Sequence, residues 1–307
     1  MLRRLLLYLS EAGWMRTLMA RFWLARRVAR RFVAGETLDE VLAVTRTLNG
    51  RGLPVSLDYL GESVQRAEDT RSVVTMYRRL VACIRQEALQ ASISLKLTHL
   101  GLDIGEELCV DNLRAILTDA QQMGVPVTID MESSHYTDAT LRIYRAMRDE
   151  HGFANVGTVI QAALKRSRDD MRQLAAEGAR IRLCKGAYLE PASVAYVDKA
   201  GVDAHFVQIM QDFLPQTPPA HLEIATHDEN MIAAALRLVE QHTVAAGHYE
   251  FQMLYGIRSA RQTELAAAGH TMRVYVPFGE TWYPYFMRRL AERPANLWFF
   301  IQALFRG

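Results

Sequence analysis

Eight short apolar runs, spaced along the chain at intervals of roughly 30 residues, most restrict what this sequence can fold into. Each run is rich in β-branched or aromatic residues, and most of them end at a glycine, an acid or a histidine. Runs of this length with such ends predict β-strands. They cover residues 54–62, 92–101, 125–133, 156–164, 179–188, 221–229, 248–256 and 271–279.

The segments between these runs have a helical pattern, as in residues 73–89 and 231–242. Strands that alternate with helices predict parallel βαβ units, and eight such units predict a (β/α)8 barrel. A chain of 307 residues is long enough for that fold. The competing fold, a doubly wound sheet, usually has a G-x-G-x-x-G turn after its first strand. Residues 58–65, "DYLGESVQ", lack this turn, so the barrel is favoured.

The residues before the first run predict a separate helical part. We expect residues 1–52 to form a helical segment packed on the barrel, and residues 53–307 to form the catalytic barrel. Residues 1–35 mix arginines with Leu, Trp and Phe, so two interpretations are open. This part is either an amphipathic helix against the barrel or a basic helix resting on an anionic membrane surface.

Charge and hydropathy limit the surroundings of the protein. The net charge of +2 produces no strong field that would favour nucleic acid. We find no stretch of about 18 apolar residues, so we expect no membrane-spanning helix. The sequence therefore predicts a cytoplasmic protein, with peripheral contact to the inner face of the cytoplasmic membrane as the alternative.

Polar side chains interrupt seven of the eight runs near their carboxyl ends, where the chemistry of a barrel gathers. One buried cation is usually a structural ion pair. Seven strands that offer polar groups at similar depth indicate the lining of a large polar ligand site. These residues are Lys96, Asp130, Gln161, Arg182, Lys185, Thr226, His227, Asp228, Gln252 and Tyr275.

Metal and serine chemistry have little support. His99, His135 and His227 follow different runs and could in principle bind zinc, but His135 is expected in a loop. There is no H-E-x-x-H, no cluster of acids and no C-x-x-C, so we expect no metal site. A G-x-S-x-G motif is also absent from the sequence.

Taken together and in order, seven motifs resemble those of the proline dehydrogenase family, above all its compact bacterial monofunctional members and the dehydrogenase domain of bifunctional proline utilisation proteins. The resemblance covers about residues 55–300. It implies a distorted (β/α)8 barrel that binds FAD without a covalent bond, with the last helix over the mouth of the barrel. The motifs are "SLKLT", "TIDMES", "VIQA", "IRLCKGAY", "ATHD", "EFQMLYG" and "YFMRRLAERPAN".

The resemblance also implies a substrate site. Arg288, Arg289 and Lys96 would bind the carboxylate of L-proline, since arginine forks match two carboxylate oxygens. Asp130 would organise Lys96. The pyrrolidine ring would lie against Leu254, Tyr275 and Tyr285.

The expected cofactor site is larger. Arg182 would contact the flavin near N5 and tune its electronics, Gln161 would hydrogen-bond the ring system, and Glu292 would fix the arginine face. Asp228 stands where relatives can carry Asn, and Leu189 follows Tyr188 where many have Trp. The full expected set is Asp130, Met131, Gln161, Arg182, Lys185, Gly186, Ala187, Tyr188, Thr226, His227, Asp228, Gln252, Leu254 and Glu292.

A gate is expected above this site. In a closed barrel the first strand lies beside the eighth, and the helix that carries Arg288 follows the eighth strand directly. Glu62, at the end of the first strand, should therefore lie close to Arg288. The resemblance implies that the two residues form an ion pair that covers the substrate.

The implied reaction is hydride transfer from the ring carbon next to nitrogen to flavin N5. Its product is Δ1-pyrroline-5-carboxylate, in the first step of proline catabolism to glutamate, with electrons passed to a membrane quinone. Two other hypotheses are a lyase or aldolase that forms a Schiff base on Lys96 or Lys185, and a non-catalytic binding module.

Overall fold

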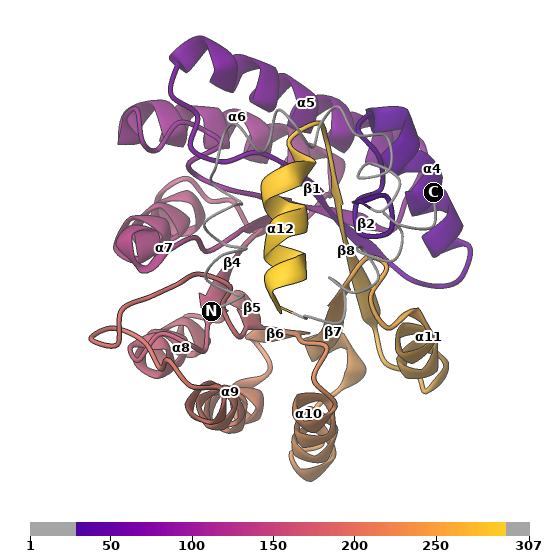
Figure 1. The fold of residues 1–307 in the computed structure, drawn as a ribbon, viewed down its shortest axis with the longest axis vertical. Helices are drawn as coiled ribbons and strands as arrows, with labels where there is room; N and C mark the ends of the chain where they lie inside the picture. The colour runs from indigo at the N-terminus through magenta and orange to yellow at the C-terminus, as the bar shows by residue number, and fades with distance from the viewer. Residues whose placement is uncertain (1–28, 293–307) are drawn as a thin grey trace, which may run out of the picture.

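The protein, analysed as a computed structural model, is described over residues 29–292, with side chains through Arg289. Within this range eight parallel strands close into one barrel in sequence order, and β1 pairs with β8 (Figure 1). The barrel predicted from the eight runs is confirmed. The strands are β1 (Val55–Tyr59), β2 (Ala91–Leu95), β3 (Val127–Ile129), β4 (Val156–Gln161), β5 (Arg180–Cys184), β6 (His221–Ala225), β7 (Tyr249–Leu254) and β8 (Met272–Phe278).

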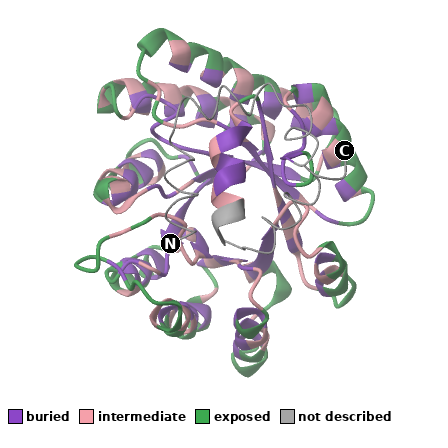
Figure 2. Cartoon of the chain, viewed as in Figure 1, coloured by how far each residue is buried: buried purple, intermediate pink, exposed green. Residues whose placement is uncertain are grey.

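Helices surround the barrel as an outer ring, with buried inner faces and exposed outer faces (Figure 2). They are α4 (Leu38–Asn49), α5 (Ala67–Gln86), α6 (Glu106–Met123), α7 (Thr137–Arg145), α8 (Ser167–Ala176), α9 (Lys199–Phe213), α10 (Glu229–Gln241) and α11 (Ser259–Ala267). Short helical turns are η1 (Ser134–Tyr136), η2 (Ala146–Glu150), η3 (Leu214–Gln216) and η4 (Ala246–His248). No helix in the described range has the length and apolar character needed to cross a bilayer.

Helix α4 fills the place in the ring between β8 and β1. Its N-terminus has a capping box, in which Thr37 and Glu40 each accept a hydrogen bond from the other's backbone. The chain before it pairs with the end of β8, where the Ala34 N–H donates to the Pro277 carbonyl at 2.9 Å. Because α4 packs on β1 and β8, it completes the ring from the N-terminal side. The proposed domain boundary at residue 52 stays a prediction, and the basic segment 1–28 lies outside the described residues.

The last described helix, α12 (Trp282–Glu292), lies across the mouth of the barrel and not beside β8 (Figure 1). The turn into it passes through Gly279, whose φ of 123° suits glycine. Trp282 and Phe286 are buried, and the Trp282 indole N–H donates to Glu36 at 3.1 Å. Burial of this face holds α12 over the carboxyl ends of the strands, as the resemblance implied.

Candidate active site

A cavity of about 430 Å³ lies beneath α12 at the carboxyl ends of the strands. Its lining includes every residue that the sequence analysis assigned to substrate or cofactor, apart from Glu292. The side chain of Glu292 lies outside the described residues. The structure therefore brings the predicted residues together, while the role of each one stays a prediction.

Five further residues line the cavity that sequence analysis did not select: Asp58, Val159, Cys184, Ala225 and Met253. Asp58 carried the same signal as Lys96, a charged residue inside an apolar run, and could have been found. The other four are small or apolar strand residues, and nothing in their sequence context distinguishes them from residues of the core.

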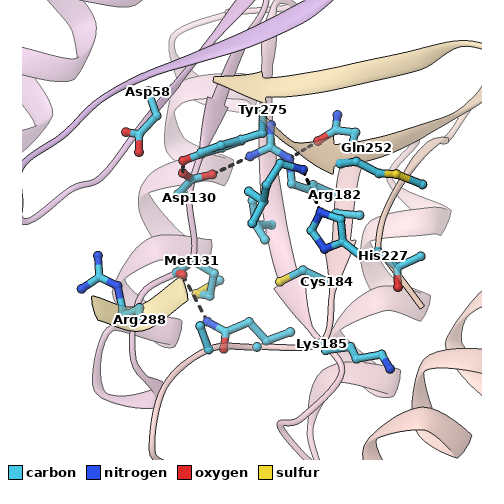
Figure 3. Close-up of a pocket in the computed structure, with 18 of the residues that line it drawn as sticks. Asp58, Asp130, Met131, Arg182, Cys184, Lys185, His227, Gln252, Tyr275 and Arg288 are labelled. Atoms are coloured by element: carbon cyan, nitrogen blue, oxygen red, sulfur yellow. Dashed lines mark hydrogen bonds and ion pairs between the residues drawn. The ribbon is translucent and has the colours of Figure 1, made fainter. Parts of the chain in front are cut away.

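Arg182 lies at the floor of the cavity, held by contacts to three other strands or their ends (Figure 3). Its Nη1 lies 2.6 Å from Asp130 Oδ1, and its Nε donates to Gln252 Oε1 at 2.5 Å. The guanidinium also lies 5.2 Å from the centroid of the Tyr275 ring, whose hydroxyl donates to Asp130 Oδ2 at 2.7 Å. Burial lowers the pKa of Arg182, but Asp130 and Glu223 outweigh it, so its pKa stands above the ordinary value. Arg182 is thus a fixed, permanent cation.

A second layer of charges orients Gln252 below Arg182. The Gln252 amide nitrogen donates to Glu223 and to Glu250, both at 2.6 Å. Arg273 in turn donates to Glu250 at 2.6 Å. Because the two carboxylates can only accept hydrogen bonds when ionised, the amide NH₂ must face them and the carbonyl must face Arg182.

Lys96 is paired with a different acid from the one predicted. Its amine lies 3.2 Å and 3.1 Å from the two carboxylate oxygens of Asp58, whereas Asp130 contacts Arg182 and Tyr275. The expectation that Asp130 directly organises Lys96 is therefore wrong, because Asp130 is already occupied. Burial lowers the pKa of Lys96, but Asp58, Asp130 and Glu62 outweigh it and hold the pKa above its ordinary value.

The two residues of the expected gate are in contact. Arg288 Nη1 lies 2.7 Å from Glu62 Oε1. Burial raises the pKa of Glu62, but Arg288 outweighs this effect, so the carboxyl pKa is below its usual value and the pair is ionised at neutral pH. Arg289 lies one residue further along α12, with its guanidinium 5.1 Å from the centroid of the Tyr285 ring.

The opposite wall offers amide, imidazole and backbone groups. The Gln161 amide nitrogen donates to the carbonyl of Met131 at 3.1 Å and to that of Glu132 at 2.7 Å. A side chain at Gly186, whose φ is 103°, would come within 2.7 Å of Gln161 Oε1, so glycine leaves room for a ligand beside this amide. His227 Nε2 accepts from the Leu254 N–H at 2.9 Å, so its ring proton is assigned to Nδ1.

Lys185 and Asp228 form a charged cluster at the far end of the cavity, and Figure 3 shows the Lys185 amine turned away from Arg182. This amine lies 2.5 Å from Asp203 and 2.7 Å from Asp228, and Lys199 contacts both acids. Burial raises the pKa of Asp228, but the two lysines outweigh it and bring the pKa well below its usual value. An Asp at position 228 thus has a structural partner in Lys185.

The three histidines considered for zinc are not brought together. Across residues 29–292 no group of three His, Cys, Asp or Glu side chains is placed to hold a metal ion. His99 lies against Tyr59, with 5.5 Å between the ring centroids, and burial with nearby Lys96 lowers its pKa to about 4.

Comparisons with known proteins agree with this arrangement. The family model described as "Proline dehydrogenase" matches residues 41–302. Proline dehydrogenase 1 of Bacillus subtilis is 44% identical over 306 residues, which is 100% of both chains. Proline dehydrogenase of Deinococcus radiodurans is 38% identical and covers 91% of both chains.

A solved structure supports the same fold. The crystal structure of proline utilization A from Bdellovibrio bacteriovorus, inactivated by N-propargylglycine, superposes with a TM-score of 0.82 at 25% sequence identity. The similarity covers 87% of this chain and 33% of that one. With a family model that spans most of the chain and full-length relatives above 30% identity, this chain belongs to the proline dehydrogenase family.

Proposed function

We propose that this chain oxidises L-proline to Δ1-pyrroline-5-carboxylate with bound FAD and passes the electrons to a membrane quinone. One observation carries the proposal: in a member of this family, Lys96, Arg288 and Arg289 line one cavity together with the apolar and aromatic walls of Tyr275 and Leu254. An amino acid with a carboxylate and an apolar ring needs both kinds of surface.

The residues present fit a flavin. Gln161, Arg182, Lys185 and His227 supply donors and charge along one side of the cavity, and Gly186 allows close approach to the backbone. A flavin bound there would accept the hydride and its electron pair, while the protein positions and desolvates the substrate. Arg182, fixed by Asp130 and Gln252, would place a permanent positive charge beside the ring system.

The ion pairs of the site oppose the Schiff-base hypothesis. A lysine nucleophile must be neutral, and such lysines have a depressed pKa. Lys96 instead has a raised pKa and lies against Asp58, so it acts as a cation that binds an anion. The quinone acceptor is supported by the family resemblance, and the N-terminal segment proposed to reach the membrane lies within residues 1–28, outside the described residues.

Anaerobic titration with L-proline tests the proposed function. We expect the purified protein to absorb visible light as a bound flavin does, and we expect L-proline to bleach that absorbance stoichiometrically. Borohydride with substrate should trap no covalent adduct on Lys96. A colourless protein, or a flavin that L-proline does not reduce, would contradict the proposal.

The ion pair between Glu62 and Arg288 gives a second expectation. Glu62→Ala should keep the FAD content and weaken proline binding or turnover severalfold, because the pair covers the substrate. Arg288→Ala should cost more, because it also removes a contact to the carboxylate. The double variant should match Arg288→Ala in steady-state kinetics. Losses that multiply independently would show that Glu62 acts without Arg288.

A further inference from the structure

The loop between β1 and α5, residues 60–66, carries Glu62, and we call it the gate loop. Two consecutive backbone donors next to Glu62 end on a single residue. The Ser63 N–H donates to Thr98 Oγ1 at 3.0 Å, and the Val64 N–H donates to the Thr98 carbonyl at 3.2 Å. The height of Glu62 over the cavity therefore depends on where Thr98 lies.

Thr98 is in turn held by a buried acid, Glu132. Its backbone N–H donates to Glu132 Oε1 at 3.1 Å, and its hydroxyl donates to Oε2 at 2.6 Å. The hydroxyl has one proton, which Glu132 takes, so its oxygen faces Ser63 as an acceptor. Burial raises the pKa of Glu132 to about 7, although both hydrogen bonds from Thr98 lower it. Burying such an acid is costly, and the contacts with Thr98 offset part of that cost.

Two more contacts connect these residues to the gate loop and the cavity. The carbonyl of Glu132 accepts from the amide of Gln161 at 2.7 Å, and Gln161 lines the cavity. On the other side, a side chain at Gly61 would come within 2.1 Å of His99 Nε2, so the gate loop packs directly on His99. One continuous set of contacts thus runs from the gate loop to the wall of the site.

We propose that Thr98 and Glu132 are positioning residues that hold the gate loop where Glu62 meets Arg288. The inference rests on the proposed function, in which Arg288 binds the substrate carboxylate. Neither Thr98 nor Glu132 is among the described residues that line the cavity, so neither is a catalytic residue. Their effect on the reaction passes through the gate loop.

Thr98→Val tests the proposal, because valine keeps the shape of threonine and removes the hydroxyl that accepts from Ser63. Thr158→Val is the matched control: Thr158 is fully buried like Thr98, but its hydroxyl donates to the Ile129 carbonyl, away from the gate loop. Hydrogen exchange is measured without proline on the peptide that covers residues 60–66. We expect exchange about tenfold faster in Thr98→Val and unchanged in Thr158→Val.

Kinetics of the FAD-loaded enzyme supply the second measurement. Thr98→Val should raise the KM for L-proline severalfold with unchanged FAD content, and it should have no further effect in a Glu62→Ala background. Thr98→Ser keeps the hydroxyl and should restore the wild-type exchange rate and KM. Glu132→Gln offers only one acceptor to the two Thr98 donors, so it should change both readouts in the same direction as Thr98→Val.

The results that would overturn the proposal are distinct. Equal exchange of residues 60–66 in Thr98→Val and Thr158→Val would show that Thr98 does not hold the gate loop. A rise in KM that persists in the Glu62→Ala background would show that Thr98 acts by another route. If L-proline fails to reduce the wild-type flavin, the proposed function falls, and the exchange comparison still decides whether Thr98 anchors the loop.

Discussion

Replacing Arg289 by methionine is expected to raise the KM for L-proline roughly ten- to hundredfold, because a charge-assisted bond to the carboxylate contributes about 1.5–3 kcal/mol. Arg289 lines the cavity from α12 and stacks on Tyr285, so methionine can fill the same space without the charge. Bound FAD should be retained. Steady-state kinetics with L-proline and the flavin absorbance of the purified variant check both expectations.

Arg78→Met is a suitable control for loss of an arginine elsewhere. Arg78 lies on α5, half exposed, and pairs with Asp119 on the outside of the barrel. Such an exposed pair contributes about 0–1 kcal/mol, so this variant should keep its KM. An unchanged KM in Arg289→Met would show that Arg289 faces the cavity without binding the carboxylate.

The barrel could be predicted from the sequence because its determinants are local. Each strand is a short apolar run with a marked end, and closure of the barrel follows once eight such runs alternate with helices. Closure also placed Glu62 beside Arg288, although 226 positions separate the two residues along the chain. The place of α4 in the ring was not predicted, because its packing on β1 and β8 became possible only when α12 took the mouth.

The partners within the site could not be predicted in the same way. Sequence order places Asp130 and Lys96 at the ends of neighbouring strands, but it does not fix the direction of their side chains. In the structure Asp130 turns to Arg182, and Asp58, from the strand on the other side, takes Lys96. The support of Thr98 by Glu132 is likewise a matter of side-chain geometry between two strand ends, and neither residue type marks it.

The pair between Lys96 and Asp58 leads to the second large expected effect. Asp58 is 1% exposed and Lys96 is 9% exposed, so Asp58→Asn leaves a buried cation without its direct counter-charge. Breaking such a pair typically costs about 3–5 kcal/mol. In the folded protein the pKa of Lys96 is raised, so its contribution to stability is present below the unfolded pKa of about 10.4 and is lost only as pH rises through the folded pKa.

Asp58→Asn should remove most of that contribution across the neutral range, and it should also change the pH dependence of substrate binding. With burial no longer outweighed by Asp58, the pKa of Lys96 falls. The KM for L-proline should then rise between about pH 7 and about pH 10, because Lys96 loses its charge there, whereas Lys96 in the wild-type protein stays charged over that range.

The double variant Asp58→Asn with Lys96→Met separates the buried charge from the loss of packing. It removes the unpaired cation, so its midpoint of thermal unfolding should lie above that of Asp58→Asn alone. Its KM should be high but independent of pH, because no lysine remains to titrate at this position. If Asp58→Asn instead shows a flat pH profile and the double variant is no more stable than the single one, then Asp58 does not set the charge of Lys96, and the carboxylates of Asp130 and Glu62 suffice to hold it.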